Sequence, residues 1–480
     1  MAVSLWGSTL PRSRLGARPG AGMGMSERDH VESGRLSRMA RLAKVAAHTA
    51  ADVLAAKARE KMGEDGADVA QSLKPTAERL VQVLGEMKGA ATKVGQFISL
   101  VDQDVFSDEA RAALHKLLHQ TPQRMTWEQV EAVVRAELGA PPDELFAAFE
   151  REPLASASMG QVHAATTRDG RDVVVKIQFP GVDRAIEADL RNAGMMAKAL
   201  SVAGGVFESR HYYEELAAVL RRELDYRQEV LQGEIYREAL RPWPDLVVPQ
   251  FVTELSALRV LTMERLHGPT MLQAAQDPSV DAAARLRIGS QLVAATWGPF
   301  LSQRVIHADP HPGNYIVLAD GRLGVLDFGA TKALSTRFTM AYWHLLGEAF
   351  ADQRADIYSI LEQAGFEMMA GRDTAEPWLN ALTDIVQRPF AGEYYDWGQC
   401  RISSDVVALK NRHLLTILKV RAPEEGLMFY RSAAGAAGDL RLLKSAGNYR
   451  QVLRDVATTA RGNLAPEVAE ALRAAPGRWT

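Results

Sequence analysis

Two short motifs near the middle of the chain carry side chains suited to phosphoryl transfer. The first runs from His307 through Asp309 to Asn314, and the second begins at Asp327 and reads Asp-Phe-Gly. Phosphoryl transfer needs a carboxylate at the acceptor hydroxyl and oxygen ligands that hold magnesium on the phosphates. Asp309 suits the first role, and Asn314 and Asp327 suit the second. Their order and spacing match the catalytic loop and D-F-G motif of protein kinases, whereas the alternative is a chance turn with satisfied carboxylates.

A lysine for the nucleotide phosphates lies upstream of these motifs. Residues 171–179 are β-branched and alternating, which predicts a strand, and Lys176 follows three valines there as in the V-A-I-K strand of kinases. Alone, it would be interpreted as a solvated lysine on an edge strand. Glu223 and Glu229 lie just under two turns apart on a predicted helical stretch, so either could pair with Lys176. A solvated, charged helix face is the alternative for that stretch.

Residues 155–162 align with the G-x-G-x-x-G-x-V loop that covers nucleotide phosphates. Gly160 and Val162 keep the pattern, but Ala155 and Ala157 replace two of the three glycines. An alanine Cβ obstructs positive φ and close backbone approach, so we expect a nucleotide geometry unlike that of an ordinary kinase. A small-residue turn is the alternative interpretation. The predicted nucleotide-binding residues of this region are Ala155, Ser156, Ala157, Ser158, Gly160, Val162, Lys176, Met263 and Glu264.

The elements that must position these groups change in character near residue 150. We predict a leader over residues 1–33, either disordered or a targeting segment, because its first part is rich in Gly, Pro and Arg and poor in acids. Helical patterns then predict an all-helical segment over 34–150, which includes a capping box at Thr126. Strand and helix patterns predict a small mixed lobe over 151–265, with a strand at 246–252, and mostly helical patterns predict a larger lobe over 266–480. Within the larger lobe we predict a helix over 282–304 and a short hairpin at Asp320-Gly321. Gly139 is expected to end the helix that the capping box begins. The sum is an α+β, bilobal, protein-kinase-like fold with an all-helical N-terminal extension.

One glycine in the predicted extension stands out. Gly95 lies between Lys93 and Gln96, inside an apolar helical stripe. A glycine inside a helix costs roughly 1 kcal/mol relative to alanine, so its presence suggests that something packs closely against it. From the residues alone, a simple helix crossing is the leading interpretation.

Composition narrows the class of protein. The 480 residues carry a net charge of −3 with 24% charged residues, a balance that argues against a dedicated nucleic-acid binder. Cys400 is the single cysteine, so a disulfide framework and a Cys-rich metal site are ruled out, and a reducing compartment is expected. No uninterrupted apolar run is long enough to span a bilayer.

Taken together, the motifs resemble the ABC1/AarF/UbiB family of atypical protein-kinase-like proteins, which includes the human ADCK proteins. The similarity covers about residues 75–450, and its combination of motifs is far more specific than any single one. The matching elements are the K-x-G-Q motif at Lys93 to Gln96, the alanine-rich loop at Ala155 to Ser158, the Gly160-Gln161-Val162-His163 phrase, Lys176 before Pro180-Gly181, the E-x-D motif at Glu223 and Asp225, the catalytic loop from Asp309 to Asn314, and Asp327-Phe328-Gly329.

The resemblance also assigns roles that the residues alone leave open. It implies that Glu229 pairs with Lys176, while Glu223 and Asp225 meet Lys93 and Gln96 of the extension. In this family the helical extension packs over the cleft that ordinary kinases use for peptide substrates. Ala308 stands where an ordinary kinase has arginine, so we expect no switching by activation-loop phosphorylation. Arg431 is expected to form a structural ion pair.

The family implies a nucleotide-dependent activity tied to lipid metabolism. We expect an atypical kinase or ATPase that binds ATP or ADP with Mg²⁺ and supports isoprenoid quinone biosynthesis, of the ubiquinone type, or related lipid metabolism. Expected partners are a lipid or quinone precursor, a peripheral membrane surface and quinone-biosynthesis proteins, but no nucleic acid. The expected location is the cytoplasm, peripheral at an inner membrane, with an organelle matrix as alternative. Two other functions stay open: a non-catalytic, nucleotide-gated lipid-binding or scaffold module, and a small-molecule phosphotransferase.

Overall fold

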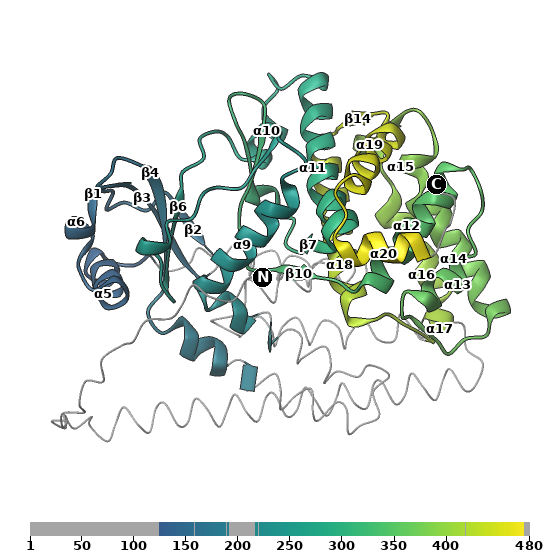
Figure 1. The fold of residues 1–480 in the computed structure, drawn as a ribbon, viewed down its shortest axis with the longest axis horizontal. Coiled ribbons are helices and arrows are strands. Elements are labelled where there is room, and N and C mark those ends of the chain that lie inside the picture. The colour runs from purple at the N-terminus through teal and green to yellow at the C-terminus, as the bar shows by residue number, and fades with distance from the viewer. Residues whose placement is uncertain are drawn as a thin grey trace.

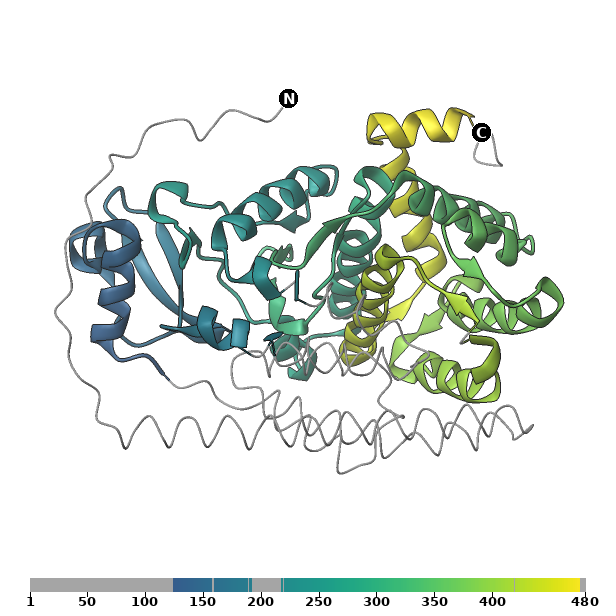
Figure 2. The same cartoon turned by 90° about the horizontal axis from the view of Figure 1, so that it is seen from below.

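The computed structural model describes residues 124–157, 159–188, 190–191, 217–218, 220–417 and 419–474. These residues form two lobes, with a small sheet-containing lobe at one end and a larger helical lobe at the other (Figure 1). The second view keeps the two lobes apart in the same way, with the early strands at one end and the late helices at the other (Figure 2). The predicted leader and most of the predicted extension lie outside the described residues.

The small lobe is built on an antiparallel sheet. Its strands are β1 (Phe146–Phe149), β2 (Ala155–Ala157), β3 (Gly160–Thr167), β4 (Asp172–Gln178) and β6 (Val260–Glu264). They pair in the order β1-β3-β4-β6, and β2 pairs with β3 as a hairpin. Since side chains alternate along a strand, each strand presents one set to the covering helix and the other to the second lobe.

Helix α5 (Trp127–Leu138) covers one face of this sheet. The predicted capping box at its start is present: the Thr126 side chain accepts from the backbone of Gln129, whose side chain in turn accepts from the Thr126 N–H. Gly139 ends the helix in the left-handed conformation. The core beneath α5 contains Met125, Val130, Val133, Val134, Phe146, Val173, Val175, Ile177 and Val260.

The described end of the predicted helical extension differs from the prediction. After the short helix α6 (Pro142–Leu145), residues 146–149 form β1, which pairs with β3 and buries Phe146 beside α5. A four-residue apolar run fits a strand or a helix equally well, and here pairing with an available sheet edge decides. Residues 125–149 therefore belong to the small lobe, to whose core Met125, Val130, Val133, Val134 and Phe146 contribute.

A second difference concerns residues 246–252, which the sequence predicts as a strand. Only β5 (Leu246–Val247) forms, and it pairs in parallel with β9 (Leu323–Val325) of the large lobe. Pro249 lacks the N–H that a continuing ladder would need. The chain instead makes an isolated bridge from Phe251 to Met263.

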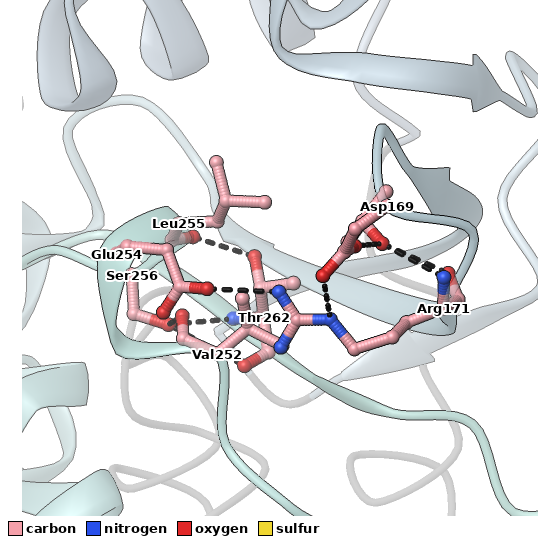
Figure 3. Close-up of polar contacts among 8 residues, drawn as sticks. Asp169, Arg171, Val252, Glu254, Leu255, Ser256 and Thr262 are labelled. Atoms are coloured by element: carbon pink, nitrogen blue, oxygen red, sulfur yellow. Dashed lines mark hydrogen bonds and ion pairs between the residues drawn. The ribbon is translucent and has the colours of Figure 1, made fainter.

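A polar network ties strand β6 to the loops beside it. The Ser256 hydroxyl donates to the Val252 carbonyl and accepts from the Thr262 N–H. Arg171 joins Asp169 to Glu254, with 2.8 Å in each ion pair (Figure 3). The loop after Pro249, the turn before β4 and strand β6 are thereby held together. This matters because the next residue along β6, Met263, is a predicted nucleotide-binding position.

The large lobe places the catalytic motifs beside its central helix. Helix α11 (Ala282–Gln303) matches the predicted helix over 282–304, and the predicted hairpin is present as β8 (Tyr315–Val317) and β9. Strand β7 (Val305–His307) pairs with β10 (Thr331–Ala333), which brackets both motifs. The other helices of eight or more residues are α9 (Tyr226–Leu240), α12 (Thr336–Phe350), α14 (Arg372–Val386), α16 (Ile402–Arg412), α18 (Glu424–Leu443), α19 (Tyr449–Arg461) and α20 (Pro466–Ala474).

Gly160 is required by a close backbone approach between β3 and β4. A Cβ on Gly160 would lie 2.0 Å from the carbonyl oxygen of Ile177. We expect Gly160→Ala to destabilise the protein by about 1–3 kcal/mol, the usual cost of overpacking, measured as a shift in the denaturant midpoint. Gly438→Ala is the control, since a Cβ there meets no described atom within 4 Å and alanine favours a helix. Equal stability of the two variants would contradict the expectation.

Candidate active site

A buried ion pair joins strand β4 to helix α9. Lys176 on β4 places its Nζ 2.9 and 3.0 Å from the carboxylate oxygens of Glu229, in the first turn of α9, and 3.9 Å from Oδ2 of Asp327. The Lys176 and Glu229 side chains are only 12% and 6% exposed. Burial alone would lower the pKa of Lys176, but the carboxylates of Asp327 and Glu229 outweigh it and raise that pKa well above its ordinary value. Lys176 is therefore held as a cation.

A break in the helical stretch decides which glutamate meets Lys176. Helix α9 starts only at Tyr226, after a turn at Leu224, so Glu223 and Glu229 do not share one continuous helix. Asp225 caps α9 by accepting from the Arg227 N–H and also pairs with the Arg227 guanidinium at 2.8 Å. Glu229 thus faces the lysine, as the resemblance implies.

Glu223 lies on the other side of that break, beside the Asp-Phe-Gly motif. A Cβ added to Gly329 would lie 3.3 Å from Cγ of Glu223. The expected contacts of Glu223 and Asp225 with Lys93 and Gln96 involve residues outside the described part of the chain, and they stay predictions.

The catalytic loop and the Asp-Phe-Gly motif are tied together through the main chain. His307 Nε2 donates to the carbonyl of Asp327 over 2.6 Å. The Asn314 amide donates to the carbonyl of Asp309 over 3.0 Å, and the Leu326 N–H donates to the carbonyl of Asn314 over 2.7 Å. Asp309, Asn314 and Asp327 therefore belong to one hydrogen-bonded framework, which the sequence spacing alone could not show.

The Asp-Phe-Gly motif has the conformation that aims its aspartate at Lys176. Asp327 has φ +60°, in the left-handed region where few non-glycine residues occur. Phe328 is fully buried and packs against Tyr236 of α9 and against Phe251, with ring centroids 5.8 and 6.0 Å apart. Packing of Phe328 holds the turn, and the turn holds the carboxylate 3.9 Å from the lysine.

Helix α18 supplies a contact to the catalytic loop whose partner sequence reasoning did not identify. Arg431 donates to Oδ1 of Asp309 over 2.7 Å, and both side chains are 8% exposed. The Ser432 hydroxyl donates to the carbonyl of His307 over 2.8 Å. A Cβ on Gly435 would lie 2.2 Å from Pro310, so the helix rests directly on the catalytic loop. The expected ion pair of Arg431 is thus with Asp309, 122 residues away, and no local pattern could have identified its partner.

Asp439, two turns further along α18, is a buried carboxyl near Asp309. Burial, together with the charge of Asp309, raises the pKa of Asp439 to about 8. The folded protein keeps this proton while the unfolded chain ionises near pH 4, so stability falls as the pH rises from about 4 to about 8. We expect Asp439→Asn to stabilise the protein by on the order of 1–3 kcal/mol at pH 8 and little at pH 4. Thermal unfolding measured across pH checks this.

The control for Asp439→Asn is Asp384→Asn, on an exposed position of α14. A stabilisation by Asp439→Asn that does not change with pH, or that grows toward acid, would contradict the assignment of a raised pKa.

The sheet face turned toward the large lobe carries three of the predicted nucleotide-binding residues, Val162, Lys176 and Met263. In register, Val162 of β3 and Leu261 of β6 flank Lys176, and Met263 lies opposite Val174. Met263 is 7% exposed and belongs to none of the core clusters of the described residues. The exposed Glu264 at the end of β6 accepts from the backbone of Gln250.

The hairpin over this face is shaped by small residues. Ala155 and Ala157 lie in β2, opposite Val162 and Gly160, and Ser156 lies opposite Gln161. Ala155 and Ser156 are exposed and Ala157 is half-buried. Ser158 lies outside the described residues, so its predicted contact is untested.

The donor set near Asp327 suits a magnesium ion held jointly with phosphates. In the described part of the chain, no three His, Cys, Asp or Glu side chains cluster closely enough to hold a metal ion. Mg²⁺ usually takes one or two protein ligands and fills its shell with water and phosphate oxygens. Asn314 donates its amide nitrogen to Asp309, which leaves its amide oxygen as a ligand, and Asp327 supplies a carboxylate. These two residues fit such an ion.

These features are the arrangement of a protein kinase. The small lobe has a five-stranded sheet, a lysine–glutamate pair joins β4 to α9, and the catalytic loop belongs to the helical lobe. The bilobal, mixed α and β fold predicted from the sequence is thereby confirmed. A sequence model of the ABC1 atypical kinase-like domain matches residues 117–361, just over half of the chain. The chain belongs to this family of atypical kinases.

Several relatives show how far the similarity extends. The atypical kinase COQ8B of Rattus norvegicus is 32% identical over 373 residues, which are 75% of this chain and 68% of that protein. The atypical kinase coq-8 of Caenorhabditis elegans is 31% identical over 308 residues, 62% of this chain but only 40% of the relative. Both relatives are named as mitochondrial. The chain thus spans two fifths to two thirds of these proteins.

A solved structure supports the same fold. The complex of Rv3197 with erythromycin from Mycobacterium tuberculosis has a TM-score of 0.57 and 27% identity, and the match covers 81% of this chain and 97% of that one. Within the described residues, no helix combines the length and the apolar character needed to cross a bilayer.

Proposed function

We propose that the protein binds Mg²⁺-adenine nucleotide between its lobes and acts as an atypical kinase or ATPase that supports isoprenoid quinone biosynthesis, of the ubiquinone type, or related lipid metabolism. The observation that carries the proposal is the position of Lys176, whose Nζ lies 2.9 Å from Glu229 and 3.9 Å from Asp327. Glu229 orients the lysine toward the nucleotide phosphates, and Asp327 connects it to the metal-binding end of the site.

Each remaining group has a role in this proposal. Asn314 and Asp327 hold the ion, which when bound neutralises charge on the phosphates. Asp309 orients the attacking hydroxyl or water. The apolar face around Val162 and Met263 receives the adenine, and the alanine-containing hairpin covers the phosphates.

A specific contact favours a second candidate, a nucleotide-gated module that binds a lipid without chemical turnover. Arg431 occupies one oxygen of Asp309 at 2.7 Å, so half of the carboxylate that would receive an acceptor's proton is already engaged. In that case the same cleft binds nucleotide, and the nucleotide controls how the protein presents a lipid or quinone precursor to its partners.

The proposed partners and location follow the names of the relatives. We propose a lipid or quinone precursor, quinone-biosynthesis proteins and a peripheral membrane surface as partners. The COQ8 relatives are named as mitochondrial and an ABC1 kinase of Arabidopsis thaliana as chloroplastic. An organelle matrix, or the bacterial cytoplasm at the inner membrane, would each supply such a surface.

The test is nucleotide binding and hydrolysis by the purified protein. We expect ATP and ADP to raise the melting temperature only with Mg²⁺, and ATP hydrolysis to rise when vesicles and a quinone-like phenol are added. Asp309→Asn should keep the nucleotide-dependent stabilisation. Loss of hydrolysis in this variant supports an enzyme, whereas binding without hydrolysis in the wild type supports the module. Absence of Mg²⁺-dependent nucleotide binding would contradict both.

A further inference from the structure

Two buried, hydrogen-bonded polar side chains, Gln161 and His163, lie on the face of β3 that is turned away from the proposed nucleotide site. Gln161 is 2% exposed and His163 is fully buried. Because side chains alternate along a strand, both point to the side opposite Val162. Neither residue takes part in the site described above, although Gln161 lies between two residues of the covering hairpin, Gly160 and Val162.

The hydrogen-bond partners of Gln161 and His163 allow only one arrangement of their protons. The Met125 N–H donates to Oε1 of Gln161 over 3.0 Å, so the Gln161 amide nitrogen must face His163. That nitrogen lies 2.8 Å from His163 Nε2, and an amide nitrogen can only donate. Nε2 is therefore unprotonated, and the single ring proton is on Nδ1, where it is donated to the carbonyl of Glu150 over 2.8 Å. Three segments of the small lobe meet at one neutral imidazole.

The surroundings favour this neutral imidazole. Burial lowers the pKa of His163, while its hydrogen bond to Glu150 and the charge of Glu152 act in the opposite direction. Glu152 itself pairs with Arg124 at 3.0 Å. Two apolar neighbours adjoin it: the Phe149 ring is 5.3 Å from the imidazole, and Val175 lies opposite in β4.

We propose that Gln161 and His163 form a proton-sensitive clamp that fastens Met125 and Glu150 to β3 and so holds the β2–β3 hairpin in place. A proton on Nε2 would set two donors against each other. Gln161 could then turn its oxygen toward the histidine only by facing its amide nitrogen toward the Met125 N–H. One of the three hydrogen bonds is lost in either case. Because the pKa of His163 is lowered in the folded protein, a falling pH protonates the open state before the closed one. The free energy that keeps the clamp closed is therefore greatest above the ordinary histidine pKa of about 6.5 and decreases as the pH falls below that value.

The clamp is expected to affect nucleotide binding through the β2–β3 hairpin. Gln161 pairs with Ser156 in register, so loosening β3 at this point also loosens the strand that carries Ala155 and Ala157. The effect on nucleotide affinity, and only that part, rests on the proposed function. The clamp itself stands on the hydrogen bonds alone.

A single substitution tests the positions of these protons, because it reverses the direction of the hydrogen bond between residue 161 and His163. In Gln161→Glu, one carboxylate oxygen still accepts from the Met125 N–H, but the other can only accept from His163. Such a carboxylate requires a proton on Nε2 and so stabilises the doubly protonated ring. We expect the amide-exchange protection of Met125 to fall on acidification in the wild-type full chain, by at most about tenfold per pH unit, and to rise in Gln161→Glu. Gln353→Glu, at an exposed position, adds the same charge and should behave as the wild type.

Nitrogen NMR of the wild-type histidine ring provides a second measurement, which does not depend on a variant that folds. The clamp requires the Nδ1–H tautomer of His163 at pH 7.5, whereas the Nε2–H tautomer would overturn it. Protection at Met125 that changes with pH in the same direction in wild type and Gln161→Glu would overturn it as well. Affinity for MgADP should fall with the same pH profile. A protein that shows this clamp behaviour but binds no nucleotide at any pH would refute the proposed function and leave the clamp intact.

Discussion

Replacing Asp327 by asparagine is expected to lower ATP turnover by roughly two to three orders of magnitude while the fold is kept. Asparagine has the same shape and tolerates the left-handed φ of +60° at this position. It lacks the negative charge that would hold Mg²⁺ and that raises the pKa of Lys176. The loss should therefore appear in the rate of hydrolysis and in the Mg²⁺ concentration needed, measured by a coupled phosphate-release assay.

The matched control for Asp327→Asn is Asp320→Asn. Asp320 lies on the exposed turn of the β8–β9 hairpin, close in sequence to Asp327 but outside the cleft, and pairs with Arg322. Its replacement should leave turnover within about twofold of the wild type, since exposed pairs contribute little. Unchanged turnover in Asp327→Asn would remove Asp327 from the metal site and with it the proposed assignment of the motif.

Replacing Arg431 by methionine is expected to lower both the stability and the activity of the protein, with its larger effect on stability. Methionine fills a similar volume but removes the cation 2.7 Å from the buried Asp309 carboxylate. Removing one partner of a buried ion pair typically costs about 3–5 kcal/mol. Turnover per folded molecule should also fall, by roughly tenfold or more, because Asp309 loses the group that holds its orientation. Denaturant unfolding and single-turnover hydrolysis measure the two effects separately.

Two further variants separate positioning from simple stability. Arg431→Lys keeps a cation but not the planar guanidinium, so it should recover part of the stability and less of the turnover. Arg285→Met removes a half-buried arginine that donates only to backbone carbonyls, including those of Val280 and Leu443. It should destabilise the protein without lowering turnover per folded molecule. If Arg431→Met also keeps full turnover, Arg431 is structural only.

Local patterns predicted the elements of the fold well where one residue type decides the backbone. The capping box at Thr126, the end of α5 at Gly139 and the hairpin over Asp320 and Gly321 are all present, because caps and tight turns are set by side chains a few residues apart. The apolar run at residues 146–149 was predicted as part of a helical segment and is a strand. Its state depends on a partner strand about twenty residues away, which short-range patterns do not record.

The sequence by itself predicted the residues of the candidate site. Lys176, Asp309, Asn314 and Asp327 suit phosphoryl transfer by type and spacing, because kinase motifs occupy single loops and strands. Only the tertiary structure decided what surrounds them. It selected Glu229 over Glu223 by breaking the helix between them, and it placed Arg431 of α18 on Asp309. It also set the direction of each hydrogen bond that links Met125 to Glu150 through Gln161 and His163. Each of these depends on atoms brought within about 3 Å across long stretches of chain, and such contacts arise from packing rather than from any local pattern.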